Sequence, residues 1–345
     1  MISSLEITGF RNYHEVYLEK IPEKTVIVGP NGSGKTNLLE ALSVWLTGES
    51  FRTINLGDAI SWGWQGFSLK GIFHHEEYHF GYTPSERLYR KNGKTVTARE
   101  YRHHHPVLLF LPEDTILLYG GAEGRRRVLD EMIFVLDEEY RGVWLTYFRV
   151  LRQRNTQLRA DPREARVWDR QLIELGSQVI EKRFFYLKQM SLRLSELYRE
   201  LYGEKVELRM LNTFRIENSI KESFAKALEG VRAMEYQRRY TLIGPHRDTF
   251  EIRLEDKNFR VVASQGQKRA LSLLLKITVA TLLRDQARLP LLLFDDVMLE
   301  MDHERQKMLL AFFWDSFPWV WTVYARDMVP GPKTYEMIEL PLSRG

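Results

Sequence analysis

The residues with the clearest chemical potential form a glycine-rich run near the start of the chain. It reads Gly29-Pro30-Asn31-Gly32-Ser33-Gly34-Lys35-Thr36, and Asn37 follows it. This is the phosphate-binding P-loop pattern, in which glycines let the backbone curl so that successive N–H groups point at one anion. Lys35 would reach the β- and γ-phosphates, and the Thr36 hydroxyl would hold Mg²⁺. We therefore predict that residues 29–37 bind a nucleotide together with Mg²⁺.

Two adjacent carboxylates supply the second part of a nucleotide site. The apolar run at 291–294 ends in Asp295-Asp296. A carboxylate at the tip of a strand beside the P-loop strand holds the water shell of the Mg²⁺, which is the Walker B role, and we assign it to Asp295. Asp296 would polarise the attacking water as general base. This motif is weak alone and gains weight from the P-loop.

A third segment, Ser264-Gln265-Gly266-Gln267, precedes an amphipathic stretch that predicts a helix. A hydroxyl, free N–H groups and a positive helix end suit a phosphate. Its place before the acidic strand resembles the signature segment of ABC-type ATPases. In that class the segment completes the site of a second protomer, so ATP is sandwiched in a head-to-tail dimer. Ser264 could equally be an ordinary N-cap, and both interpretations can hold together.

The elements that position these motifs can be predicted from periodicity. Residues 1–24 alternate around a break at 9–13, which favours an antiparallel hairpin ahead of a buried strand at 25–28. Tyr13 or Arg11 in that break could stack on a base or cover a sheet edge. A helix should begin after the P-loop, and residues 67–105 predict an antiparallel β layer. We interpret the three histidines at 103–105 as a solvated segment, because consecutive residues do not converge on one metal.

The rest of the chain suggests an insertion. Residues 107–111 predict a buried strand, whereas residues 120–237 are almost wholly helical in pattern. Strand patterns return at 249–254 and 259–262. We therefore predict an ATPase head made of residues 1–119 and 238–345, with a helical lobe of residues 120–237 inserted in it.

Composition sets broad limits on function. The chain has 345 residues, 44% hydrophobic and 28% charged, which are typical of a soluble globular protein. A net charge of +4 and a pI near 9.0 permit nucleic-acid binding without requiring it. The absence of cysteine excludes disulfides and thiolate chemistry. No signal peptide or run long enough to span a bilayer is evident, so we expect a soluble, cytoplasmic protein without a membrane partner.

Together these motifs resemble the RecF family of bacterial recombination-repair ATPases along nearly the whole chain. The segments that carry the resemblance are Phe10-Arg11-Asn12-Tyr13, the P-loop through Ala41, Ser50-Phe51-Arg52, Leu111-Pro112-Glu113-Asp114, Arg125-Arg126-Arg127-Val128-Leu129-Asp130, Gln153-Arg154-Asn155, Trp168-Asp169, Thr241-Leu242-Ile243-Gly244-Pro245-His246-Arg247-Asp248 and Ala263-Ser264-Gln265-Gly266-Gln267. The Gly-Pro-His-Arg-Asp and Gln-Arg-Asn segments are the most specific to this family.

The resemblance implies an α/β fold: a P-loop ABC-type ATPase head, with a mixed sheet and an antiparallel β layer, and an inserted, mainly helical lobe in place of the long coiled coil of Rad50 and SMC proteins. It implies slow, DNA-stimulated ATP hydrolysis, an ATP-dependent homodimer that binds double-stranded DNA or single-strand/double-strand junctions, and work with RecR and RecO to place RecA at gaps. It implies a part in DNA replication, the DNA-damage response and the SOS response.

The sequence also departs from the usual pattern of ABC heads. Pro112-Glu113-Asp114 stands where a glutamine is usual after the strand, Thr322 where a histidine is expected, and Leu299 where the family has serine, with Asp302 still available. The residue that senses the γ-phosphate is therefore open. Candidate DNA contacts are Arg52, Arg125, Arg126 and Arg127, although an arginine run is often a solvated helix start. Nothing suggests base-specific readout, so binding should rest on phosphates and depend on salt.

Two other classes of protein stay open on sequence alone. One is an ABC-type transport ATPase subunit coupled to a membrane partner, which the helical insertion and the missing histidine disfavour. The other is a defence-type ATPase with an appended nuclease, although the sequence offers no carboxylate cluster outside the P-loop site. The sequence gives neither the hydrolysis rate nor the surface that meets RecR.

Overall fold

The computed structural model describes residues 2–102, 106–297, 312–313, 315–318, 320–324 and 336–340. The histidines at 103–105, Leu299 and Asp302 lie outside this part. The chain forms two compact units, one of residues 1–112 and 283–345 and the other of residues 113–282. No helix in the described ranges is long and apolar enough to cross a membrane.

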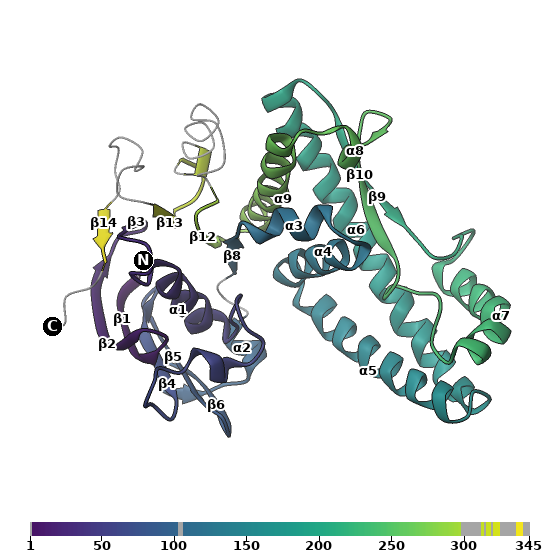
Figure 1. Cartoon of the computed structure of the whole chain (residues 1–345), viewed down its shortest axis with the longest axis horizontal. Helices are drawn as coiled ribbons and strands as arrows, with labels where there is room; N and C mark the ends of the chain where they lie inside the picture. Colours follow the sequence, from purple (N-terminus) through teal and green to yellow (C-terminus); the bar gives the residue numbers. More distant parts are fainter. Residues whose placement is uncertain are drawn as a thin grey trace. The chain divides into compact units, whose positions relative to one another are not determined.

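A five-stranded parallel sheet carries the P-loop strand in the first unit (Figure 1). Its strands, in sheet order, are β14 (Glu336–Glu339), β3 (Lys24–Val28), β13 (Val320–Tyr324), β12 (Leu291–Phe294) and β8 (Val107–Phe110). The apolar runs of β3 and β12 show no alternation because both faces of these strands are buried, as parallel strands require. The predicted strands at 25–28, 107–111 and 291–294 are confirmed.

An antiparallel sheet forms the second layer of this unit, as the alternating pattern predicts. Its order is β2 (Tyr13–Ile21), β1 (Ile2–Phe10), β4 (Phe67–Phe73), β5 (Glu76–Thr83), β6 (Glu86–Lys91) and β7 (Lys94–Thr95). The hairpin of β1 and β2 turns between Phe10 and Tyr13, which pair across it. The short helices η1 (Leu56–Ala59) and α2 (Ala98–Arg102) also belong to this unit.

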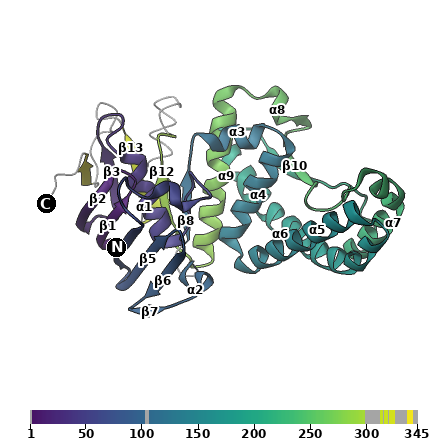
Figure 2. The same cartoon turned by 60° about the horizontal axis from the view of Figure 1, so that its bottom comes forward.

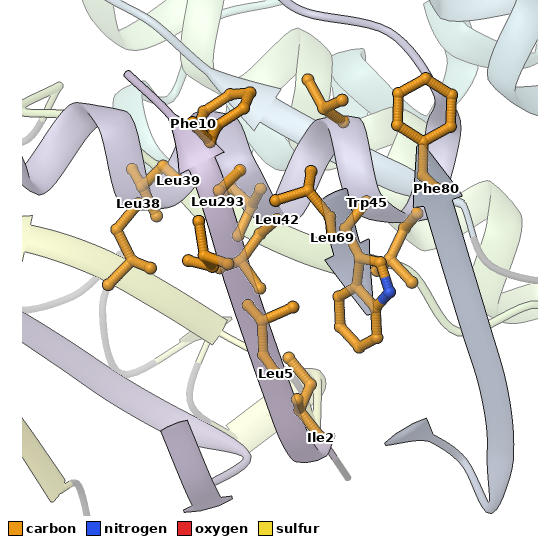
Figure 3. Packing of buried hydrophobic residues seen from close by; sticks show 14 of the residues in the cluster. Ile2, Leu5, Phe10, Leu38, Leu39, Leu42, Trp45, Leu69, Phe80 and Leu293 are labelled. Atoms are coloured by element: carbon orange, nitrogen blue, oxygen red, sulfur yellow. The ribbon is translucent and has the colours of Figure 1, made fainter. Parts of the chain in front are cut away.

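The helix α1 (Lys35–Thr47) lies in the core of the first unit. Its residues from Leu38 to Leu46 are all buried, since side chains of both sheets surround it (Figure 3). Leu5 and Leu69 of the antiparallel sheet and Leu293 of the parallel sheet belong to the same apolar cluster. A helix that is apolar all round is fixed on every side, so the P-loop at its start rests on a rigid support.

The second unit is mainly helical (Figure 2). Its helices are α3 (Glu113–Tyr119), α4 (Ala122–Leu136), α5 (Glu138–Ala160), η2 (Glu164–Trp168), α6 (Asp169–Tyr202), α7 (Ile220–Arg238), α8 (Phe259–Val262) and α9 (Gln265–Asp285), the last of which runs past residue 282 into the first unit. Gly203 ends the 34-residue α6 in the left-handed conformation, at the turn expected there.

Two local predictions in this unit are wrong. The helical stretch contains a strand, β9 (Val206–Leu211), which pairs with β10 (Thr249–Leu254) and packs on α6. Residues 259–262 form the helix α8 instead of a strand, because the Asn258 side chain accepts a hydrogen bond from the Arg260 N–H and caps a helical turn. The strand β11 (Lys257–Asn258) extends this three-stranded sheet beyond β10.

The boundaries of the units differ from the predicted 120 and 237. The second unit begins at residue 113 because α3 packs on α4. It extends past residue 237 because β10 pairs with β9 and packs on α4, and it includes most of α9, whose Lys276 forms an ion pair with Asp114 of α3. A change of composition along the chain cannot indicate which strands pair across a long sequence separation. As a consequence, Ser264 and the first turns of α9 belong to this second unit.

Candidate nucleotide-binding site

The P-loop connects the end of β3 at Val28 to the start of α1 at Lys35. Gly34 caps α1 with φ 104° and Gly32 has φ 80°, conformations that favour glycine. No side chain among the described residues caps the helix, and its first turn holds no acidic residue. The N–H groups at this helix start are therefore left for an anion, which the helix dipole also favours.

Two polar groups in the loop lack the partner that a triphosphate would provide. The Lys35 Nζ donates hydrogen bonds to the carbonyls of Gly29 (2.8 Å) and Pro30 (3.1 Å), and the residue is 8% exposed. The Ser33 hydroxyl is buried and has no hydrogen-bond partner among the described residues. An ammonium held by two loop carbonyls and a buried hydroxyl without a described partner fit the β- and γ-phosphates of a nucleotide.

The fold brings together Thr36 and Asp295, which are 259 residues apart in sequence. The Thr36 Oγ1 donates to the Asp295 Oδ1 at 3.0 Å. A hydroxyl and a carboxylate in contact at the P-loop are the protein ligands that Mg²⁺ uses when phosphates and waters complete its shell. No cluster of three His, Asp or Glu residues suited to a metal occurs within the described ranges, and this type of site does not need one.

Asp296 differs from its neighbour in backbone and in charge environment. Its φ of 52° is left-handed, which is strained for a residue with a side chain. Burial raises the pKa of the Asp296 carboxyl, while the nearby Lys35 charge opposes the rise. A carboxylate with an upward-shifted pKa next to the P-loop lysine suits a general base, which remains a prediction for Asp296.

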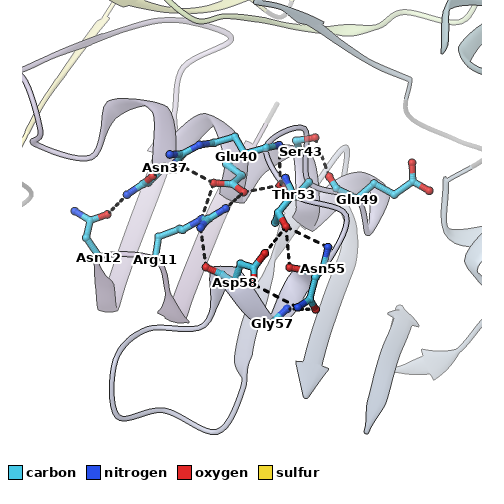
Figure 4. A network of polar contacts seen from close by, with 12 residues as sticks. Arg11, Asn12, Asn37, Glu40, Ser43, Glu49, Thr53, Asn55, Gly57 and Asp58 are labelled. Carbon is cyan, nitrogen blue, oxygen red and sulfur yellow. Dashed lines mark hydrogen bonds and ion pairs between the residues drawn. The ribbon is translucent and has the colours of Figure 1, made fainter. Parts of the chain in front are cut away.

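A buried carboxylate on α1, which the sequence analysis missed, organises the polar groups behind the P-loop (Figure 4). The Glu40 side chain is 0% exposed and accepts two hydrogen bonds from the Arg11 guanidinium, at 2.8 and 2.6 Å. Ser50 donates to it at 2.6 Å and Arg52 at 3.4 Å. Arg52 also donates to the Asn37 side chain at 2.7 Å. One carboxylate thus fixes two arginines beside the start of α1.

The hairpin turn of β1 and β2 supports the P-loop directly. The Tyr13 hydroxyl donates to the Gly34 carbonyl at 3.0 Å, and burial raises its pKa, so it stays a donor. Asn12 accepts from the Asn37 side chain at 2.7 Å. A Cβ at Gly34 would stand 2.6 Å from the Asn12 amide nitrogen. Tyr13 is 5% exposed, which leaves little of its ring for a base, and its contact with adenine stays a prediction.

The sequence signal for Glu40 was a charge within the apolar stretch of a helix. Residues 38–46 are otherwise almost all apolar, and a charge buried among them requires a partner. The partner is Arg11, in the hairpin turn and with a left-handed φ of 51°. Such a pairing needs the three-dimensional structure, because the two residues come from different layers of the unit. Arg52, predicted as a DNA contact, is 44% exposed and belongs to this same network.

The segment 264–267 begins α9 with a reciprocal cap. The Gln267 N–H donates to the Ser264 hydroxyl at 3.2 Å, and the Ser264 N–H donates to the Gln267 side chain at 2.9 Å. The N-cap interpretation of Ser264 is therefore confirmed. Ser264, Gln265 and Gly266 are exposed, so the N-terminus of this helix is accessible to solvent in the single chain. Its predicted contact with a second protomer's nucleotide stays a prediction.

The arginines at 125–127 are held by the second unit itself. Arg125 donates to the carbonyls of Phe250 (2.9 Å) and Gly120 (3.1 Å), and Arg127 forms an ion pair with Glu131 one helical turn away. Arg126 reaches the Arg247 carbonyl at 3.4 Å. The structural interpretation of Arg125 and Arg127 is thus favoured over a DNA contact, whereas Arg126 has no carboxylate partner in the described part.

Two segments singled out in the sequence build buried polar networks in the second unit. Arg154, 1% exposed, donates to Asp169 (2.9 Å), Thr241 (2.8 Å) and Glu235 (2.7 Å). Asp248, 0% exposed, accepts from the hydroxyl and the N–H of Thr213. Buried charges of this kind need several partners, so these segments hold the helices and β10 in register.

Thr322, which stands where ABC heads usually have a histidine, lies inside the parallel sheet. It pairs with Phe294 and Val26 inside the parallel sheet and is 1% exposed. The tips of β12 and β3 lie beyond it, because Asp295 and Gly29 follow the paired residues. The buried position of Thr322 gives no support to a role in sensing the γ-phosphate, and residues 325–335 lie outside the described ranges.

The chain resembles proteins of one kind in all three comparisons. Residues 1–69 match the model of the RecF/RecN/SMC N-terminal domain. The protein called DNA replication and repair protein RecF from Moorella thermoacetica is 35% identical over 320 residues, covering 90% of this chain and 86% of that one. Its namesake from Caldanaerobacter subterraneus subsp. tengcongensis is 31% identical over 328 residues, covering 90% of each chain.

Solved structures agree with these relatives. The recombination mediator protein RecF with ATP, from the RecFOR pathway, is 28% identical and superposes with a TM-score of 0.88, covering 98% of this chain and 95% of that one. The Smc head bound to the C-terminal winged-helix domain of ScpA is 17% identical with a TM-score of 0.54, which shows a shared fold. The predicted fold class, an ABC-type ATPase head with a helical lobe, is confirmed.

Proposed function

Because the chain belongs to the RecF family of DNA replication and repair proteins, within the SMC- and ABC-like ATPases, we propose that it is an ATP-dependent DNA-binding protein of recombinational repair. ATP and Mg²⁺ bind at the P-loop, and a head-to-tail dimer closes around double-stranded DNA or a single-strand/double-strand junction. Slow, DNA-stimulated hydrolysis then releases the DNA. In the cytoplasm the protein helps RecR and RecO to load RecA at gaps. This family assignment favours repair over a transport subunit.

The contact between Thr36 and Asp295 is the observation that carries this proposal. It joins the P-loop helix to the tip of β12 at 3.0 Å, as a Mg²⁺–nucleotide site requires. Lys35 and the orphaned Ser33 hydroxyl lie in the same loop. Residues 29–37 therefore hold the triphosphate, Thr36 and Asp295 the metal ion, and Asp296 the attacking water.

The switch in this proposal is a population shift. A nucleotide that contacts Lys35 of one protomer and the exposed start of α9 in the other binds the dimer better than the monomer, so ATP favours the dimer by that difference in affinity. The capping bonds of Ser264 fix this helix start without burying it. Residues 264–267 are thus the segment that we expect to complete the partner's site.

Gel filtration with and without ATP tests dimer formation, and retention of labelled duplex DNA tests binding. Lys35→Arg should abolish ATP-dependent retention, because the longer guanidinium cannot take the place of the ammonium between loop and phosphates. Lys94→Arg, on the exposed strand β7, is the matched control and should behave as wild type. A wild-type protein that stays monomeric and retains no DNA at saturating ATP would contradict the proposal.

A further inference from the structure

Arginines from separate segments of the second unit gather around Tyr240. The Arg247 guanidinium lies over the Tyr240 ring, 5.1 Å from its centroid. Arg126 of α4 donates to the Arg247 carbonyl at 3.4 Å. Arg238, at the end of α7, and Arg247 lie close enough to the Tyr240 hydroxyl to lower its pKa. The local potential is therefore strongly positive.

The helix α5 continues this basic surface. The side chain of Asn155 accepts a hydrogen bond at 2.8 Å from the N–H of Thr241, which follows Tyr240 in the chain. Arg152 and Arg159, three residues before and four after Asn155, are its neighbours on the helix surface, and both are exposed. We call Arg126, Arg152, Arg159, Arg238 and Arg247 the arginine surface.

Acidic residues do not balance this surface as they balance others in the same unit. From Tyr140 to Ala160, α5 has five arginines and no carboxylate. The nearest buried acids are already engaged, because Glu235 and Asp169 bind Arg154. No ion pair to a member of the arginine surface occurs in the part of the chain that the structure describes. Other arginines of this unit do pair, as the half-buried Arg193 does with Glu196 and the exposed Arg209 with Glu207.

Unpaired guanidiniums held close together repel one another unless an anion lies between them. Burial and the charge of Arg183 lower the pKa of the Arg126 guanidinium, against the opposing charges of Glu123 and Asp130, and the charge of Arg247 adds to the lowering. Several guanidiniums along a surface match a row of phosphates, since each guanidinium can form two parallel hydrogen bonds to one phosphate. Arg152 and Arg159 are seven residues apart, about 10 Å along the helix, a spacing within reach of successive phosphates of one strand.

We propose that the arginine surface binds the phosphodiester backbone of DNA, as the place where the repair protein proposed above meets its duplex. The inference rests on that proposed function and adds residues that the sequence analysis did not single out, since only Arg126 was among its candidates. Arg247 stacks on Tyr240 and is thereby preorganised, which reduces the conformational entropy lost on binding. Contacts of this kind carry no base specificity.

The test measures the affinity for a fluorescein-labelled duplex by anisotropy, with saturating ATP, over a salt series from about 50 to 200 mM. Log affinity decreases linearly with log salt concentration, and each lost phosphate contact reduces the magnitude of this slope by about 0.9. In the double variant Arg238→Ala/Arg247→Ala the magnitude of the slope should therefore decrease by about 2. This variant should bind the duplex about 10- to 100-fold more weakly. ATP-driven dimerisation and DNA-independent ATP hydrolysis should not change.

Two further variants guard against a folding defect. Arg152→Ala/Arg159→Ala should give the same loss, and alanine is the best residue for a helix surface, so α5 stays folded. Arg193→Ala/Arg209→Ala removes two arginines of the same unit that do have carboxylate partners, and it should keep wild-type affinity and slope.

The outcomes separate this inference from the function on which it rests. Wild-type protein that binds no duplex with ATP would overturn the proposed function and this inference with it. ATP-dependent binding by wild type, with unchanged affinity and slope in both surface variants, would overturn this inference alone. Variants that keep DNA affinity but lose retention of poly-glutamate would assign the surface to an acidic polypeptide and would also overturn it.

Discussion

The substitution Glu40→Gln tests how the P-loop is supported. Each carboxylate oxygen of Glu40 accepts two hydrogen bonds, from Arg11 and Ser50 on one side and from Arg11 and Arg52 on the other. An amide places an N–H₂ group against donors wherever it points, and it leaves the Arg11 charge without its counter-charge. Breaking a buried ion pair costs about 3–5 kcal/mol, and we expect the lower end, about 3 kcal/mol, because Arg11 and Arg52 keep some access to water.

Differential scanning calorimetry measures this cost. A loss of about 3 kcal/mol should lower the midpoint of the transition of the first unit by roughly 6–12 °C. The matched control is Glu49→Gln, which affects an ion pair with Arg102 at 3.3 Å, where the Glu49 side chain is 45% exposed. That pair should be worth less than about 1 kcal/mol. A Glu40→Gln protein that melts within about 2 °C of this control would refute the argument.

Three other substitutions give distinct expectations. Asp296→Asn should still bind ATP and dimerise but hydrolyse it about 10²- to 10⁴-fold more slowly in a steady-state phosphate-release assay, and a wild-type rate would remove Asp296 from the general-base role. Ser264→Arg should block ATP-driven dimerisation in gel filtration while costing only about 1 kcal/mol through the lost cap, and dimers that survive it would place residues 264–267 away from the interface. Burial lowers the pKa of His246 in the folded protein to about 4. As the pH falls, this histidine therefore takes up a proton in the unfolded chain before it does so in the folded one. The free energy of unfolding should be unaffected above about pH 6.5 and should decrease by up to about 3 kcal/mol towards pH 4. Urea denaturation at several pH values measures this loss, which His246→Gln should reduce.

The parts of the fold that the sequence predicted are those governed by local pattern. The P-loop, the hairpin ahead of it and the strand that ends at Asp295 follow from spacing and turn chemistry. By contrast, β9 is a strand because it pairs with β10, about 40 residues further along the chain, and packs on α6. Local propensity does not contain that information. Residues 259–262 form a helical turn instead of the predicted strand, because the Asn258 side chain caps this turn with one hydrogen bond.

The candidate site divides in the same way. Lys35, Thr36 and Asp295 were predicted because their chemistry imposes a fixed motif, and the structure brings the last two into contact. Glu40 and its two arginines were missed because nothing in sequence indicates that the hairpin turn lies against α1. Arg125 and Arg127 were predicted as DNA contacts, but the structure shows intramolecular partners for both.

The burial of α1 between two sheets links nucleotide supply to the lifetime of the protein. A nucleotide at the start of α1 binds only the folded unit, since unfolding separates the two sheets that hold this helix in place. ATP at one hundred times its dissociation constant would add about 2.7 kcal/mol to folding and lower the unfolded population roughly a hundredfold. A cell depleted of ATP would therefore expose this protein to proteases, so energy starvation would reduce its abundance as well as its activity.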